Sequence, residues 1–309
     1  MSALPERVLI REVGPRDGFQ NEPETIPTEE KLRLIELLLD SGLRRVELTS
    51  FVRGDVIPQL SDAEELMEQI LPREGVTYSA LVPNIRGLER AGKFSEKLDE
   101  VSFFCSASES HNRANVNRSV EESLSGLEEA VPAALEIGLR PVAVISVSFG
   151  CPYEGKVSPD VVFEIAERLI AAGCEEIGFG DTTGMANPLQ VKDFFRAAAS
   201  RLGSSQLTAH FHNTRGQGLA NALAALEAGV DSFESSFGEL GGCPVPPGAT
   251  GNVATEDLVA MFEEMGIDTG VDIERLVVAS REVQEILGRP LGSHVLTAGP
   301  VDWSGPETP

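Results

Sequence analysis

The sequence has no run of 18 or more apolar residues, and residues 1–7 contain neither an apolar stretch nor an Arg- and Ser-rich amphipathic stretch. The first absence excludes an ordinary membrane-spanning helix. The second disfavours a cleaved secretory or organellar leader. We therefore expect a soluble, cytoplasmic protein that is not processed at its N-terminus and has no membrane partner.

Cysteine is scarce, with four residues in 309, at positions 105, 151, 174 and 243, and no C-x-x-C pair. This spacing excludes a disulfide scaffold and a paired-cysteine zinc site. Cys105, Cys151 and Cys174 lie in or next to apolar segments, so we predict that they are buried and have no chemical role. The nucleotide-binding patterns G-x-G-x-x-G after the first strand-like run and G-x-x-x-x-G-K-[ST] are also absent, which disfavours a Rossmann dehydrogenase.

Basic residues are outnumbered, because 25 Lys and Arg face 49 Asp and Glu and give a net charge of −24. A field of this sign repels nucleic acids and anionic membrane surfaces, so we expect neither as a partner. The same field opposes an anionic substrate. Such a substrate would need a metal ion or a local group of arginines to offset the charge.

The sequence does contain a regular alternation of short β-branched or apolar runs with amphipathic stretches. The runs are residues 8–13, 45–49, 76–82, 100–105, 142–148, 176–179, 207–212 and 232–236. Eight parallel strands with right-handed crossovers favour an α/β fold of the closed (β/α)8 TIM barrel type over a doubly wound open sheet. We expect one catalytic domain over residues 1–309, with extra C-terminal helices and a flexible tail from about residue 300.

Helices are predicted between and after these runs, and several carry recognisable ends. The stretches are residues 28–39, 119–135, 159–172, 188–201 and 217–227, followed near the C-terminus by 255–265 and 273–287. Thr28 is a candidate N-cap, with Glu at the next two positions. Gly42, Gly138 and Gly173 stand where helices are expected to end.

Polar and glycine-rich segments follow every one of the eight runs, and in a barrel these segments meet at the face that carries the active site. The sharpest feature among them is His210-x-His212, because residues two apart on a strand point to the same side and can share one metal ion. With Asp17 after the first strand and Asn252 after the eighth, the set of nitrogen and oxygen ligands favours Mg²⁺ or Mn²⁺, with zinc as an alternative.

Arg16 adjoins the expected metal site and can present a planar cationic group to a developing enolate oxygen. Glu47 lies inside the second strand, where an unpaired carboxylate would be costly, so we expect it to orient Arg16. Cys243 lies in a glycine-rich segment and is a candidate proton donor on a loop that could close over the site.

Five segments together resemble the 3-hydroxy-3-methylglutaryl-CoA lyase family, and the match extends from about residue 8 to residue 290. The segments are 13–22 (VGPRDGFQNE), 49–52 (TSFV), 150–155 (GCPYEG), 180–184 (GDTTG) and 241–252, which begins GGCP and ends GN. The Arg-Asp, H-x-H and Gly-Asn elements alone fit the wider superfamily of metal-dependent barrel aldolases and synthases. The GCPYEG and GGCP segments narrow the resemblance to the lyase.

The resemblance implies a carbon–carbon lyase that uses Mg²⁺ or Mn²⁺. By a retro-aldol reaction it would cleave an acyl-CoA thioester, 3-hydroxy-3-methylglutaryl-CoA, to acetyl-CoA and acetoacetate. The resemblance assigns the metal ligands to Asp17, His210, His212 and Asn252. It assigns catalytic roles to Arg16, which polarises the thioester carbonyl, to Asp17, to Glu47 and Asp181, which support the site, and to Cys243, the catalytic thiol. Glu256 matches a further supporting acid, and we also expect a homodimer.

Departures from the family pattern leave the acyl group and the manner of CoA binding open. Pro23 replaces a lysine, Asn213 and Arg215 replace Asp and Tyr, and Glu239 replaces an apolar residue. Arg215 and Glu239 are expected to neutralise each other across the closed loop. The alternatives are therefore a related lyase acting on another branched hydroxyacyl-CoA, such as citramalyl-CoA, and a barrel without catalytic activity that serves as a scaffold.

Overall fold

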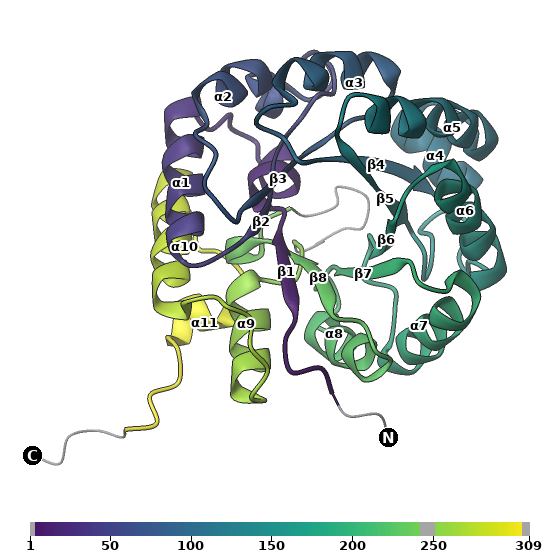
Figure 1. The fold of residues 1–309 in the computed structure, drawn as a ribbon. Coiled ribbons are helices and arrows are strands. Elements are labelled where there is room, and N and C mark those ends of the chain that lie inside the picture. Colours follow the sequence, from purple (N-terminus) through teal and green to yellow (C-terminus); the bar gives the residue numbers. More distant parts are fainter. Residues whose placement is uncertain (1–3, 242–250, 305–309) are drawn as a thin grey trace, which may run out of the picture.

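Eight parallel strands close into a barrel in the computed structural model, which describes residues 4–241 and 251–304. The strands are β1 (Leu9–Glu12), β2 (Arg45–Ser50), β3 (Thr77–Leu81), β4 (Glu100–Ser106), β5 (Arg140–Ser146), β6 (Glu176–Asp181), β7 (Gln206–Phe211) and β8 (Ser232–Ser235). Neighbours in the ring follow the sequence order, and β1 completes it by pairing with β8, from Leu9 opposite Ser232 to Glu12 opposite Ser235 (Figure 1). The predicted TIM barrel is confirmed.

Helices surround the ring of strands (Figure 1). They are α1 (Thr28–Asp40), α2 (Ala63–Gln69), α3 (Ile85–Ala91), α4 (Glu109–Val116), α5 (Val120–Glu136), α6 (Pro159–Ala172), α7 (Pro188–Leu202) and α8 (Gly218–Glu227), followed by α9 (Thr255–Glu264), α10 (Ile273–Leu287) and α11 (His294–Ala298). The sequence had not predicted α2, α3, α4 and α11, which are all eight residues long or shorter and therefore show little periodicity. None of the described helices is both long and apolar enough to cross a bilayer.

Some of the helix ends follow from local chemistry. Helix α5 begins with a capping box, in which Ser119 and Glu122 each accept a hydrogen bond from the backbone of the other. Gly173 ends α6 with a φ of 126°, a conformation that favours glycine. Thr28 is not the N-cap that we predicted: it is the first residue of α1, and its hydroxyl donates a hydrogen bond to Asp62, 2.8 Å away.

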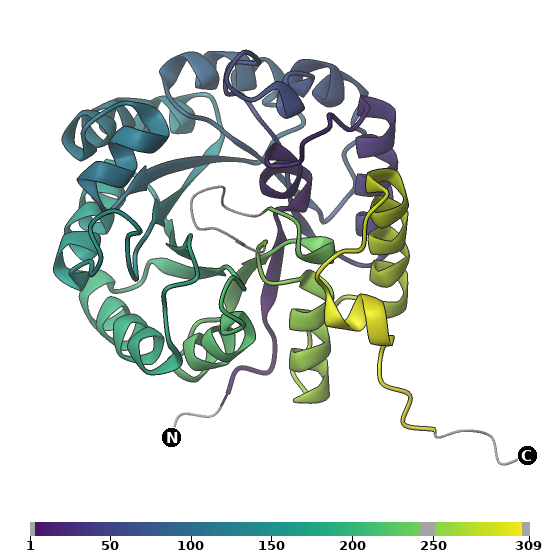
Figure 2. The same cartoon turned by 180° about the vertical axis from the view of Figure 1, so that it is seen from behind.

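The C-terminal helices complete the outer layer. Helix α10 packs against α1, so that the first and the last long helices lie side by side in both views (Figures 1 and 2). After α11 the chain leaves the barrel as an extended segment (Figure 2). Residues 305–309 of the predicted tail lie outside the described residues.

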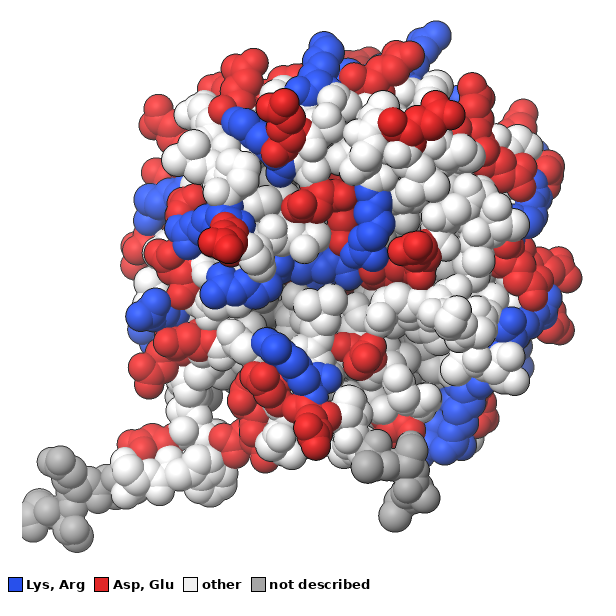
Figure 3. Space-filling view, in the orientation of Figure 1, with Lys and Arg blue, Asp and Glu red and all other residues white. Residues whose placement is uncertain are grey.

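Acidic side chains are spread widely over the surface, as the net charge requires. Figure 3 shows Asp and Glu around the rim of one face, with Lys and Arg in a band across its middle. The negative charge is therefore distributed over this face and does not form a single patch.

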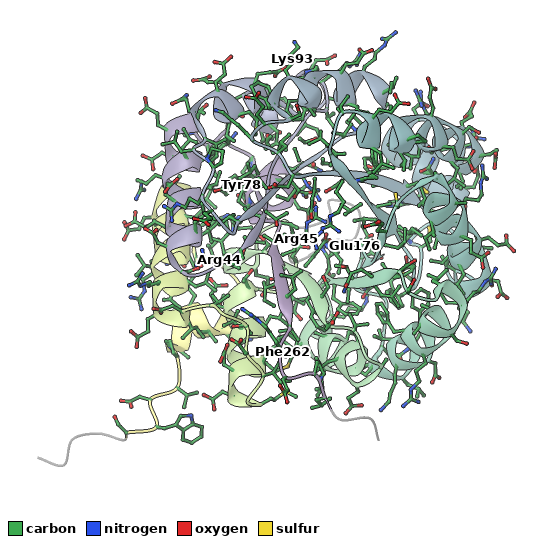
Figure 4. All side chains as sticks on the ribbon, viewed as in Figure 1. Arg44, Arg45, Tyr78, Lys93, Glu176 and Phe262 are labelled. Atoms are coloured by element: carbon green, nitrogen blue, oxygen red, sulfur yellow. The ribbon has the colours of Figure 1, made fainter. Side chains whose placement is uncertain are left out.

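Charged side chains also lie inside the barrel, near the N-terminal ends of the strands. Arg45 at the start of β2 is 3% exposed and forms ion pairs of 2.8 Å with both Glu100 and Glu176, which begin β4 and β6. Figure 4 shows Arg45 and Glu176 together near the centre of the ring. Arg140 pairs with the same two carboxylates from β5. This lower layer of the barrel is held by charge pairing, whereas apolar side chains such as Phe179 and Phe195 pack between the strands and the helices.

Replacing Glu176 with Ala should lower the free energy of unfolding by about 3 kcal/mol, because it leaves buried arginines with too few carboxylates. Denaturant unfolding followed by circular dichroism measures the change. The control is Glu227→Ala, which removes an exposed partner of Lys192 and should leave the unfolding midpoint unchanged. Equal midpoints for all three proteins would contradict a stabilising role for the buried layer.

Candidate metal and catalytic site

The predicted site residues lie where β1, β2 and β7 approach the C-terminal face of the barrel. Arg16 and Asp17 belong to a π-helical turn, Gly14–Gly18, that follows β1 directly. Glu47 is in the middle of β2, and His210 is in β7. His212 follows β7 and forms an antiparallel bridge with Asn252, which brings the distant Gly251-Asn252 segment back to the site.

Asp17, His210 and His212 converge as the sequence predicted. Each offers one ligand atom, and these atoms all lie within 4.8 Å of one another. The Nε2 atoms of His210 and His212 are 3.1 Å apart, and both side chains are buried. Asn252 joins the group by donating a hydrogen bond from Nδ2 to Asp17 Oδ2, at 2.7 Å. The structure therefore brings all four predicted metal ligands together.

The chemistry of this cluster fits a divalent metal ion. Asn252 Oδ1 is buried and has no hydrogen-bond partner among the described residues. A buried polar atom of this kind costs free energy unless something binds it. A carboxylate, two imidazoles and an amide oxygen are ligands that suit Mg²⁺ or Mn²⁺ and do not exclude zinc. The four residues could hold such an ion without rearranging the strands.

Asn252 is held in place by Leu240, which precedes the segment that contains Cys243 in the sequence. Both its backbone N and its Nδ2 donate to the carbonyl oxygen of Leu240, at 3.2 and 3.0 Å. The neighbouring Gly251 must be glycine, since a Cβ there would lie 1.8 Å from the carbonyl oxygen of Glu239. Cys243 itself lies outside the described residues.

Arg16 is fixed beside the cluster by two carboxylates. Its Nε donates a hydrogen bond to Glu47, as predicted, and its Nη1 donates to Asp17 Oδ1 at 2.6 Å. Burial opposes the charge of Arg16, but Glu47 and Asp17 outweigh it and raise its pKa. The second terminal nitrogen, Nη2, has no acceptor among the described residues, so one face of the guanidinium is available to a ligand.

Sequence reasoning missed Glu234, which orients His210. Glu234 Oε2 accepts a hydrogen bond from His210 Nδ1 at 2.8 Å, so the opposite ring nitrogen faces Asp17 and His212. Burial disfavours the charged form of Glu234, but Arg11 and His210 outweigh it and lower its pKa to about 2. The signal was available, because Glu234 is a charged residue in the middle of a predicted strand, as Glu47 is.

The predicted supporting acids hold backbone turns around the site. Asp181 accepts hydrogen bonds from the backbone N of Met185 and Ala186, at 2.8 and 3.1 Å, and none from the four metal-ligand candidates. Glu256 accepts from the backbone N of Gly238 at 3.0 Å. The structure thus places both acids in structural contacts behind the cluster.

Glu12, which the sequence did not single out, holds the turn of Arg16 and Asp17 to the end of β8. It accepts from the backbone N of Gly14 at 2.7 Å and of Phe237 at 3.1 Å, and from the hydroxyl of Thr255 at 2.7 Å. No motif in the sequence identifies Glu12. Its one local indication is its position at the end of a buried strand.

The expected pairing of Arg215 with Glu239 is wrong. Arg215 donates from Nη1 to the backbone carbonyl oxygens of Thr183 and Gly184, at 2.7 and 3.0 Å. The carboxylate of Glu239 instead lies within 4.8 Å of the ligand atoms of Asp257 and His294. Arg215 therefore stabilises the turn after β6. A local sequence pattern does not distinguish an arginine with this structural role from one that contacts a substrate.

Three buried acids make stability depend on pH. Burial raises the pKa of Glu12 to about 8, of Glu256 to about 7 and of Asp181 to about 6. An acid with a raised pKa in the folded state binds its proton more tightly there than in the unfolded chain. Its stabilising contribution is therefore complete below the unfolded pKa and is lost as the pH rises through the folded value.

For Glu12 the pH window in which this stabilising contribution is lost extends from about pH 4.5 to about pH 8. Glu12→Gln keeps an oxygen acceptor for the two backbone N–H groups and cannot ionise. We expect its free energy of unfolding to fall less with pH than that of the wild type, by about 1 kcal/mol per pH unit within the window. Urea unfolding at pH 5, 6, 7 and 8 measures this, and parallel curves for the two proteins would refute it.

Comparisons with known proteins agree with this geometry. The sequence model of the family described as HMGL-like matches residues 7–283. A hydroxymethylglutaryl-CoA lyase of Bacillus subtilis is 46% identical over 292 residues, which cover 94% of this chain and 97% of the relative. The mitochondrial hydroxymethylglutaryl-CoA lyase of Rattus norvegicus is 44% identical over 96% of this chain and 91% of its own length.

Solved structures give the same result. The crystal structure of the Bacillus subtilis HMG-CoA lyase covers 95% of this chain and 98% of its own, with a TM-score of 0.92. An HMG-CoA lyase of Acinetobacter baumannii, solved with coenzyme A and 3-methylmalate, is 40% identical, covers 100% of both chains and has a TM-score of 0.93. With this barrel, this cluster and these relatives, the chain belongs to the HMGL-like family of aldolase-type lyases, and it is a member of its hydroxymethylglutaryl-CoA lyase branch.

Proposed function

We propose that the protein is a divalent-metal-dependent lyase that cleaves 3-hydroxy-3-methylglutaryl-CoA to acetyl-CoA and acetoacetate. The observation that carries the proposal is the meeting of Asp17, His210, His212 and Asn252 beside Arg16 at the mouth of the barrel. The family is divalent-metal dependent in general, and one of the relatives was solved with coenzyme A bound. These findings support a CoA thioester as the substrate.

Asp17, His210, His212 and Asn252 would hold Mg²⁺ or Mn²⁺, which supplies Lewis-acid polarisation of the substrate oxygens when bound. Asp17, or a water that it orients, accepts the proton of the tertiary hydroxyl. The bond between C2 and C3 then breaks, its electron pair forms the thioester enolate, and the new ketone leaves as acetoacetate. The Nη2 face of Arg16 stabilises the enolate oxygen, and Cys243 protonates the enolate carbon to give acetyl-CoA.

Arg215 no longer argues for an unusual acyl group. Because its side chain is bound to the turn of Thr183 and Gly184, it does not need a substrate carboxylate as a partner. This favours the ordinary lyase substrate over citramalyl-CoA. The related structure with 3-methylmalate supports including the corresponding thioester as a competitor.

The experiment that tests the proposal is a panel of thioesters assayed with Mg²⁺ and with Mn²⁺, with products identified by mass. The panel contains 3-hydroxy-3-methylglutaryl-CoA, citramalyl-CoA and the thioester of 3-methylmalate. Formation of acetoacetate and acetyl-CoA with the highest kcat/KM supports the proposal. A higher kcat/KM for another thioester would assign that substrate instead, and no cleavage of any of them would favour the non-catalytic scaffold.

We also propose a homodimer located in the cytoplasm. The described cysteines, Cys105, Cys151 and Cys174, are buried free thiols, as predicted, and suit a reducing compartment. A relative from Rattus norvegicus that is 40% identical is a cytoplasmic lyase. Light scattering after size-exclusion chromatography tests the dimer.

Replacing His210 or His212 with Ala should weaken the binding of Mn²⁺ by at least about 10-fold, since each change removes one imidazole ligand. Isothermal titration of the metal-free protein measures the affinity without any substrate. His111→Ala is the control, because His111 hydrogen-bonds to Ser106 and belongs to no group of candidate ligand atoms among the described residues. Equal losses in all three variants, or none, would refute the assignment of the metal site.

Replacing Arg16 with Lys should lower kcat about 100-fold while the KM changes little, because the enolate charge develops only in the transition state. Lysine keeps the charge but cannot contact Glu47, Asp17 and the substrate at once. Arg90→Lys is the control, since Arg90 pairs with Glu64 on the outside of the barrel. If kcat stayed constant and only KM rose, Arg16 would be a binding residue.

A further inference from the structure

Arg11 is a fully buried arginine that the proposed chemistry does not use. It lies on β1 and points into the barrel, with 1% of its surface exposed. Its register partner on β8 is Glu234, and the register partner of Glu234 on β7 is His210. Arg11 therefore lies directly in line with a candidate metal ligand, two strands away.

The guanidinium of Arg11 contacts four other strands. Nη1 donates to Glu234 Oε1 at 2.8 Å, and Nη2 lies 3.5 Å from Glu47 Oε1. Nη2 also donates to the hydroxyls of Ser79 and Ser102, at 3.0 and 2.5 Å. Burial opposes the charge of Arg11, but the surrounding carboxylates, first Glu234 and then Glu47, outweigh burial and raise the pKa. Arg11 therefore stays positive.

Both carboxylates that Arg11 contacts are shared with the site, each through its other oxygen. Glu234 gives Oε1 to Arg11 and Oε2 to His210. Glu47 gives Oε1 to Arg11 and Oε2 to Arg16. Two chains of contacts therefore start at one guanidinium, and one ends at a candidate metal ligand while the other ends at the candidate enolate-stabilising arginine.

We propose that Arg11 is a positioning residue of the site, which fixes Glu234 and Glu47 together and thereby sets the directions of His210 and Arg16. Only the catalytic part of this inference, the effect on kcat, rests on the proposed function. A planar guanidinium can hold two carboxylates and two hydroxyls in fixed directions, whereas an ammonium on a flexible stem cannot. Replacing a group that orients a metal ligand typically weakens metal binding about 10- to 100-fold.

The chain offers a matched control in Arg45. Arg45 is equally buried in the barrel and also holds two carboxylates, Glu100 and Glu176. Neither of these carboxylates forms an ion pair or a hydrogen bond with Arg16 or His210 in the described parts of the chain. A change at Arg45 therefore disturbs a buried ion pair that has no direct contact with Arg16 or His210.

The experiment compares Arg11→Lys, Arg45→Lys and the wild type for Mn²⁺ affinity, measured by electron paramagnetic resonance without thioester, and for kcat and KM. Arg11→Lys should bind Mn²⁺ about 10-fold more weakly and lose about 10-fold in kcat, with little change in KM. Arg45→Lys should have a lower Tm and unchanged Mn²⁺ affinity and kcat.

A second variant keeps the proposal testable if Arg11→Lys does not fold. The double variant Ser79→Ala and Ser102→Ala leaves every charge in place and removes two acceptors of Arg11 Nη2. It should weaken Mn²⁺ binding about threefold, in line with the modest energy of such hydrogen bonds.

The proposal is overturned if the folded Arg11 or serine variants keep wild-type Mn²⁺ affinity, or if Arg45→Lys loses as much affinity as Arg11→Lys. Because metal binding is read without substrate, these results do not depend on which thioester is cleaved. A wild type that binds Mn²⁺ but cleaves none of the thioesters would refute the proposed function and leave the role of Arg11 in metal binding to be decided by the same titrations.

Discussion

Arg11 and Arg45, which are buried inside the barrel, each depend on carboxylates from other strands. Burying an unpaired ion costs several kcal/mol, so the interior is stable only when arginines and carboxylates are matched. Arg45 is matched with Glu100 and Glu176 near the start of the strands, and Arg11 with Glu234 and Glu47 above it. Arg16 and Asp17 form the next pair, at the mouth. The candidate site is the uppermost level of a series of charge pairs that begins at the opposite end of the barrel.

This arrangement also explains how a strongly acidic protein could accept an anionic thioester. The carboxylates nearest the candidate site are already paired: Glu234 with Arg11, and Glu47 with both Arg11 and Arg16. Other acidic residues are spread over the outer face that Figure 3 shows, where water and salt screen them. Arg11 and Arg16 thus offset part of the charge of Glu47, Glu234 and Asp17. A bound divalent metal ion would supply the further positive charge that an anionic substrate needs.

The sequence predicted the elements whose signals are local. Alternating runs gave all eight strands, and the H-x-H spacing gave two adjacent imidazoles, because both patterns depend on neighbours in one segment. It did not predict the partners of those groups. Arg11 and Glu234 meet through the register of β1 and β8, which are more than 200 residues apart in sequence. No single segment contains that information.

Errors arose where one residue type has two common uses. Thr28 resembled a helix cap but bonds to Asp62, and Arg215 resembled a substrate contact but bonds to a turn. In both cases the alternative partner comes from another part of the fold. The role of Glu47 was predicted correctly because a lone carboxylate buried inside a strand is costly and requires a nearby cation. Arg16, at the expected metal site, was the cation that the sequence indicated, and it does bond to Glu47.

The double hydrogen bond between Leu240 and Asn252 closes the base of the segment that contains Cys243. Two residues tied in this way can stay in place when the length of the chain between them changes, because doubling the length of a connecting segment adds only about 0.6 kcal/mol to the cost of closing it. The position of Asn252 is thus uncoupled from the composition of the intervening segment. Variation in that segment can occur while the four candidate metal ligands stay where they are.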